Sequence, residues 1–208
     1  MNSAKNNILK RLQNVNSPLK AQPATIDKMD AFYPEATDEL DILFAQAFQK
    51  NGGKFIYCES QKELMENLHL LAKQRNWSNL YCWNQALQQI FERHNFAYCT
   101  TRDNLINSDA GITTCEALIA RTGSILLSSN SESGRSLSIV PPVHIVIATP
   151  NQVVYNLKEV LSLQTARADQ WPSMLCFTST NSRTADIEKT LVNGAHGPKE
   201  IFVFMLDI

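Results

Sequence analysis

From about residue 37 onward, short apolar runs alternate with stretches whose apolar residues recur at helical spacing. The apolar runs have strand length and lie at 55–58, 80–83, 96–99, 125–128, 144–148, 174–178 and 201–206. Helical spacing occurs at 38–50, after Ser60, after Asn84, at 117–120, after Thr149 and at 182–191. Because alternation of this kind is typical of strand–helix–strand units, it predicts an α/β fold with a mostly parallel sheet and helices on both faces.

The first 36 residues have a different character. Apolar side chains at helical spacing predict a short helix over about residues 4–15, and a stretch with three prolines follows it. We therefore expect residues 1–36 to form a helix and linker arm, and residues 37–208 to form the α/β domain.

The balance of charge excludes several classes of function. Nineteen basic and twenty acidic residues leave a formal net charge of −1, and no run of Lys or Arg occurs. A nucleic-acid binder needs a concentrated basic surface, so no nucleic-acid partner is expected. The apolar runs are far shorter than the ~20 residues of a membrane span, and the N-terminus does not resemble a signal peptide. The composition predicts a soluble, cytoplasmic protein.

Familiar catalytic and cofactor motifs are missing. The sequence contains no GxGxxG, P-loop, HExxH or GxSxG pattern. Its five cysteines are widely spaced, without the CxxC pairs that hold zinc or iron–sulfur clusters. We therefore expect no metal and no cofactor on this chain, so that any redox chemistry would depend on other proteins.

Polar residues beside glycines gather in the second half, where five of the seven glycines lie. Loops that follow parallel strands are where α/β sheets carry their sites. Thr113 and Glu116 stand in such a loop, where they could hold an anion and supply an acid or base, or could simply cap the helix predicted at 117–120. Thr122 and Gly123 follow that helix, and Gly123 is predicted to end it in a left-handed conformation.

The loop 128–136 is rich in hydroxyl groups and carries one arginine. Ser128 begins it, and Arg135 suits the capture of a carboxylate or phosphate, although a solvated loop would have the same composition. His144 follows two prolines, which fix the approach to a strand through a trans or cis bond. His144 is as compatible with a structural role as with a ligand-facing one.

The last candidates lie near the C-terminus. Ser182, Arg183, Thr184 and Asp186 begin the helix predicted at 182–191, where free N–H groups could bind an anion. A tight turn then carries two further candidates, His196 and Gly197, and His196 could pair with Asp186 across the site.

Three stretches occur in order along the second half of the chain: 111–129 (GITTCEALIARTGSILLSS), 134–148 (GRSLSIVPPVHIVIA) and 182–207 (SRTADIEKTLVNGAHGPKEIFVFMLD). Together they resemble the lactate-utilization (LUD) domain, specifically its protein C branch. The resemblance implies a fold like that of ribose-5-phosphate isomerases and CoA transferases. It also implies a part in oxidising L-lactate to pyruvate beside iron–sulfur partner proteins, which would carry the clusters. Many relatives have an acidic residue where this chain has Arg121, and no catalytic residue is carried over.

Three functions are compatible with these observations. The leading hypothesis is a non-redox subunit of a lactate-oxidising complex that binds a small carboxylate or phosphate. A stand-alone enzyme acting on a phosphorylated or CoA-linked small molecule is the second. The third is a regulatory or assembly module whose pocket is no longer used.

Overall fold

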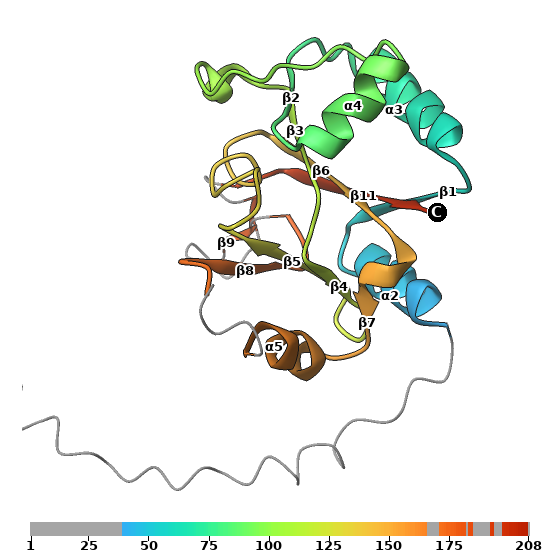
Figure 1. The fold of residues 1–208 in the computed structure, drawn as a ribbon, viewed down its shortest axis with the longest axis vertical. Helices are drawn as coiled ribbons and strands as arrows, with labels where there is room; N and C mark the ends of the chain where they lie inside the picture. The colour runs from blue at the N-terminus through green and yellow to red at the C-terminus, as the bar shows by residue number, and fades with distance from the viewer. Residues whose placement is uncertain (1–38, 166–170, 182, 185–191, 194–196, 208) are drawn as a thin grey trace, which may run out of the picture. The chain divides into compact units, whose positions relative to one another are not determined.

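The computed structural model describes residues 39–165, 171–181, 183–184, 192–193 and 197–207. The predicted arm, residues 1–36, lies outside these ranges. A five-stranded sheet forms the centre of the described part, in the order β1-β11-β6-β3-β2 (Figure 1). Its strands are β1 Lys54–Cys58, β11 Glu200–Leu206, β6 Val143–Ala148, β3 Ala110–Thr113 and β2 Leu80–Cys82. Every neighbouring pair is parallel, which confirms the predicted sheet.

Two helices cover one face of this sheet, α3 (Gln61–Arg75) and α4 (Gln85–Arg93) (Figure 1). Their starts follow from the sequence, because the Ser60 side chain accepts a hydrogen bond from the Glu63 N–H and Asn84 accepts one from Leu87. Their apolar sides pack on alternate residues of the strands. The members of this core from α3, α4 and the strands include Leu64, Leu68, Leu87, Phe91, Ile112, Ile145 and Phe204.

The opposite face is covered by α2 (Leu40–Lys50) and by a second sheet. Phe44 and Phe48 of α2 are fully buried and stack with ring centroids 5.4 Å apart. Burial of such a side chain contributes about 1.5–3 kcal/mol. The second sheet has the order β7-β4-β5-β8, formed by β7 Val153–Val154, β4 Ala117–Ile119, β5 Ser124–Ser128 and β8 Leu175–Thr178.

Helix α5 (Leu157–Thr165) lies on the outer side of the second sheet (Figure 1). Its Val160 joins a small apolar cluster with Ala117, Ile119 and Leu126. Four further short elements complete the described fold: the 3₁₀ turns Leu105–Asn107 and Pro150–Gln152, and the strands β9 (Arg183–Thr184) and β10 (Val192–Asn193), which form an antiparallel pair.

The helix predicted at 117–120 is wrong, because Ala117–Ile119 form strand β4. The segment is buried on both sides and pairs with β5 and β7, so its four apolar residues have no polar helix face to present. The capping box is wrong as well. Thr113 contacts His144 instead, and the Glu116 N–H donates to the Leu126 carbonyl.

Other short elements also differ from their prediction. The helix expected directly after Thr149 is a 3₁₀ turn followed by strand β7, and the helix α5 begins only at Leu157. The run 96–99 forms a single bridge from Cys99 to Tyr81, not a strand. The helix predicted to begin at 182 is wrong at residues 183–184, which form β9. The described peptide bonds are all trans, and these include the bonds of the two prolines before His144.

Candidate functional site

Thr113 and His144 form a buried pair between the neighbouring strands β3 and β6. The Thr113 Oγ1 lies 2.8 Å from the His144 Nε2, and each residue is 1% exposed. The other ring nitrogen, Nδ1, has no hydrogen-bond partner among the described residues. Burial lowers the pKa of His144 to about 4, so the ring is neutral at pH 7. The structure thus brings two predicted residues together, but out of reach of solvent.

The cover over this pair depends on Gly111. Gly111 is the register partner of His144, and a Cβ at this position would collide with the Leu137 carbonyl oxygen. The side chain of Pro141 would also come within 3.0 Å. Glycine therefore lets the connection before β6 cross directly over β3, and this close approach closes the region against water.

The loop after β5 is anchored at several points. The buried Ser128 accepts a hydrogen bond from the Asn130 N–H through its hydroxyl, which is a structural role. Arg135 is exposed and donates to the Ser173 hydroxyl, shortly before β8. Glu132, which was not singled out from the sequence, accepts from the Gln85 N–H at the start of α4. The loop therefore joins α4 to the second sheet.

Thr122 and Gly123 form the turn between β4 and β5. Gly123 has a φ of +59°, so the left-handed conformation is confirmed, but it closes a hairpin and does not end a helix. Hydroxyl contacts run from Thr122 through Ser124 to Ser179, with oxygen–oxygen distances of 2.7 and 2.6 Å. The turn is also tied to α2, because Asn51 donates to the Thr122 carbonyl.

A cavity of about 350 Å³ lies beside the end of this series of hydroxyls; we call it the hydroxyl cavity. The hydroxyl-bearing side chains of Ser138, Thr178, Ser179 and Thr180 line it. Ile139 and the half-exposed aromatic ring of Phe177 add apolar surface. Its hydroxyls can donate hydrogen bonds to a ligand oxygen or accept them from a ligand hydroxyl.

A second cavity of about 470 Å³ shares Ile139 with the first; we call it the Lys199 cavity. Gly197, a predicted site residue, lines it together with Lys199. Sequence reasoning missed Lys199, because it stands before a strand and not after one. The other lining residues are Ile106, Asn107, Ser108, Val140 and Pro142.

The remaining predicted residues lie apart from these groups. Glu116 is exposed in the connection from β3 to β4. Arg183 and Thr184 form the backbone of β9. Ser182, Asp186 and His196 lie outside the described residues, so the proposed pairing of Asp186 with His196 stays a prediction.

The described cysteines are free thiols. Burial raises the pKa of Cys82 to about 12 and also raises that of Cys115, so both are protonated at neutral pH and are poor metal ligands in this state. Across the described ranges, no three His, Cys, Asp or Glu side chains are grouped closely enough to hold a metal ion. In the same residues, no helix has both the length and the apolar content needed to cross a bilayer.

Comparison with known proteins places these features in a family. The model of the LUD domain matches residues 43–206. Lactate utilization protein C of Halalkalibacterium halodurans is 37% identical over 94 residues, which are 44% of this chain and 41% of that protein. Lactate utilization protein C of Oceanobacillus iheyensis is 26% identical over 185 residues, 85% of this chain and 73% of that protein. The match to the first of these relatives thus spans less than half of its length.

A solved structure has the same fold. The crystal structure of a DUF162 family protein from Deinococcus radiodurans aligns with a TM-score of 0.62 at 20% sequence identity, covering 83% of this chain and 99% of that one. Because the family match covers most of the chain, this protein belongs to the LUD domain family, in the branch whose members are named lactate utilization protein C.

Proposed function

We propose that this protein is a cytoplasmic component of a lactate-utilization system that oxidises L-lactate to pyruvate together with iron–sulfur partner proteins. The observation that carries the proposal is the LUD domain match over residues 43–206, with relatives named lactate utilization protein C. The chain's own task in this proposal is to bind a small anion, while the partners transfer the electrons.

The state of the thiols supports this division of labour. A cysteine must be a thiolate to hold an iron–sulfur cluster. Cys82 and Cys115 lie apart in buried, apolar surroundings that keep them protonated. Cys58, also buried, has its pKa raised by the same cause. These thiols act as core packing groups and are unsuited to share a cluster.

The two cavities support the second half of the proposal. Lys199 supplies a positive charge to one cavity, and four hydroxyl-bearing residues line the other. A carboxylate is recognised by charged and neutral donors of this kind. The buried Thr113–His144 pair takes no direct part, because neither side chain reaches solvent.

The test is reconstitution with candidate iron–sulfur proteins from the same organism. The full-length protein is used as bait for co-purification, and L-lactate oxidation is then measured with an artificial electron acceptor, with and without it. We expect co-purification and a rate that depends on this chain. A matched strain that lacks other lactate dehydrogenases should lose growth on L-lactate when the gene is deleted.

Two results would contradict the proposal. Unchanged growth on L-lactate after deletion of the gene would refute the proposed role of this protein in lactate utilization. Turnover of L-lactate by the purified chain alone, without partner proteins, would instead make it a self-sufficient enzyme and refute the assignment of electron transfer to its partners.

A further inference from the structure

The Lys199 cavity lies at the amino edge of the five-stranded sheet. Residues 106–108 precede β3, residues 139–142 precede β6, and residues 197–199 precede β11. These three strands are neighbours, in the order β11-β6-β3, so their incoming segments meet at one place. The N–H groups of Lys199 and Glu200 both point at the Pro142 carbonyl, with N···O distances of 2.8 and 3.4 Å, which fixes two of the three segments to each other.

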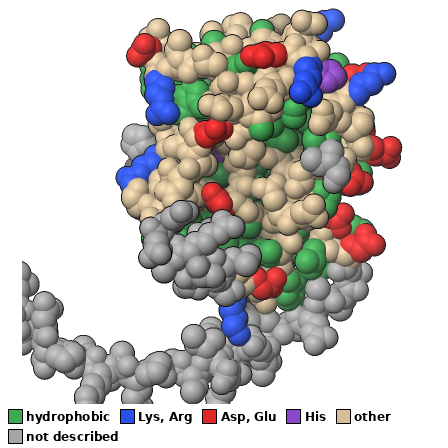
Figure 2. All heavy atoms as spheres, viewed as in Figure 1, with side chains coloured by type: hydrophobic (Ala, Val, Ile, Leu, Met, Phe, Trp, Pro, Cys, Tyr) green, Lys and Arg blue, Asp and Glu red, His purple; other side chains and the backbone are tan. Residues whose placement is uncertain are grey.

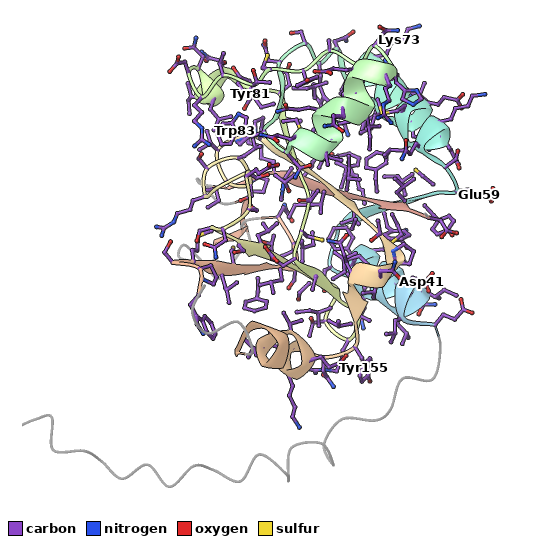
Figure 3. All side chains as sticks on the ribbon, in the orientation of Figure 1. Asp41, Glu59, Lys73, Tyr81, Trp83 and Tyr155 are labelled. Carbon is purple, nitrogen blue, oxygen red and sulfur yellow. The ribbon has the colours of Figure 1, made fainter. Side chains whose placement is uncertain are left out.

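The third segment is held by two aromatic residues, Tyr81 of β2 and Trp83, which directly follows β2. The Tyr81 hydroxyl donates to the Asp103 carbonyl and the Trp83 Nε1 donates to the Thr101 carbonyl, each at 3.3 Å. Both rings lie beside β2 in Figure 3. They fix residues 101–103, from which the 3₁₀ turn Leu105–Asn107 leads to the cavity. The wall formed by Ile106 and Asn107 is therefore supported from the sheet.

The charge in this cavity is available to a ligand. Glu200, the neighbour of Lys199, is bound by Lys54 and by Arg75. Among the described residues, the exposed ammonium of Lys199 has no carboxylate partner, and the Asn107 carboxamide has no hydrogen-bond partner. The cavity thus offers one unpaired positive charge and one neutral donor on the same lining.

Three aliphatic side chains of the lining are unusually exposed, whereas Ser108 is buried. Ile106 is 78% exposed, Ile139 is 42% and Val140 is 38%. On the face drawn in Figure 2, exposed hydrophobic side chains occur in small groups among polar ones. Aliphatic side chains around one lysine favour a ligand that combines a negative group with an apolar body.

We propose that the Lys199 cavity binds a monocarboxylate with a larger aliphatic body than lactate or pyruvate has, its carboxylate on Lys199 and Asn107 and its aliphatic part on Ile106 and Val140. This binding proposal rests on the small-anion role proposed above for the chain, and it adds where the anion binds and what class of anion it is. The volume of about 470 Å³ supports the larger body, because ligand pockets of about 300–1,000 Å³ bury compounds far bigger than a three-carbon acid.

Calorimetric titration of the purified full-length chain tests the proposal. The probes are 4-methyl-2-oxopentanoate, pyruvate and inorganic phosphate, each added separately. We expect the branched acid to bind about tenfold or more tightly than pyruvate, because each additional buried methylene strengthens binding by about fourfold. Phosphate, which has no apolar part, should bind more weakly than the branched acid.

Variants locate the binding. Lys199→Gln removes the charge and leaves a polar side chain one bond shorter, and should weaken binding of the branched acid by about tenfold or more. Val140→Ser should reduce the difference between the branched acid and pyruvate. Lys73→Gln is the control, because Lys73 is an exposed lysine of α3 that lines neither cavity (Figure 3). Circular dichroism verifies that each variant is folded.

Equal affinity of the Lys199→Gln and unmodified chains would overturn the site, and so would no binding of the branched acid. Phosphate binding tighter than the branched acid would overturn the ligand class. These readouts are separate from lactate oxidation. If Lys199→Gln loses binding of the branched acid but supports normal growth on L-lactate, the ligand site stands and a part for this cavity in lactate use fails.

Discussion

Replacement of the buried histidine by glutamine, His144→Gln, should change how the stability of this protein depends on pH. His144 lies between β3 and β6 with its Nε2 on the Thr113 hydroxyl, and it is 1% exposed. Burial lowers its pKa from 6.5 to about 4. Glutamine has no titratable group, so the substitution removes the proton that links this position to pH.

The sign follows from the two pKa values. Below pH 6.5 the unfolded chain binds a proton at His144, whereas the folded chain does not bind it until about pH 4. The unfolded state therefore gains stability as the pH falls through this window, and the free energy of unfolding decreases. At about 1.4 kcal/mol for each pH unit, the loss between pH 6.5 and pH 4 amounts to about 3 kcal/mol.

Urea unfolding followed by circular dichroism, at several pH values from 4.5 to 7.5, measures this dependence. We expect the unmodified chain to lose most of the 3 kcal/mol over the range, and His144→Gln to lose less although it starts about 1–3 kcal/mol lower at pH 7. Glu200 does not confuse the comparison. Burial alone would raise its pKa, but Lys54 and Arg75 lower it, so its contribution is lost below pH 4.5.

His94→Gln is the matched control, because it removes a half-exposed imidazole from the end of α4. It should keep the steep dependence of the unmodified chain. If the free energies of the unmodified chain and of His144→Gln fall in parallel between pH 6.5 and 4.5, the buried neutral histidine does not produce the effect and the reasoning is refuted.

Three further predictions concern packing and charge, each measured by urea unfolding. Gly123→Ala should destabilise the fold by about 1–3 kcal/mol more than Gly134→Ala, because both have φ near +60° but only Gly123 abuts the backbone of α2; equal losses would contradict this. Gly111→Ala should lower the free energy of unfolding by about 1–3 kcal/mol, because the new Cβ collides with the Leu137 carbonyl oxygen. An unchanged free energy would show that the loop containing Leu137 moves aside without loss of stability. Glu200→Gln at pH 7 should lower the free energy of unfolding by less than about 1 kcal/mol, and added salt should shrink this loss, since its ion pairs are partly exposed and therefore screened; a larger loss that salt leaves unchanged would contradict this.

The elements that the sequence predicted well are those with strong local signals. Helices α2, α3 and α4 have apolar residues at sustained helical spacing, and Ser60 and Asn84 cap two of them as their side-chain chemistry requires. The central strands β6 and β11 are mostly apolar because both of their faces are buried. In these segments local preference and tertiary packing favour the same structure.

The second sheet was predicted only in part: the apolar runs 125–128 and 174–178 form β5 and β8, but β4 and β7 were missed. Its strands are two to five residues long, and segments such as 117–119 and 153–154 carry too few residues to show a period. Pairing partners from distant parts of the chain decide their conformation. The pattern at Thr113 and Glu116 does not form a capping box, because the Thr113 hydroxyl contacts His144, which lies 31 residues away in the sequence.

The site was predictable only in part. The sequence pointed to loops that follow strands as the places for a site. Gly197 was identified for a different reason, because it stands in a tight turn beside polar residues. The Lys199 cavity is formed by three segments that precede β3, β6 and β11, and the strand order that brings them together is not written in any one of them. Lys199 itself has no sequence signal beyond being a surface lysine.

The way in which the two sheets share the chain has a consequence for folding and for engineering. Strands β4 and β5 lie between β3 and β6 in sequence, while β7 and β8 lie between β6 and β11. The second sheet is thus assembled from both connections between neighbouring strands of the first, and no single cut in the chain separates them. The sheets should unfold in one cooperative transition, and half-protein fragments divided between β5 and β7 should have to associate before either sheet is complete.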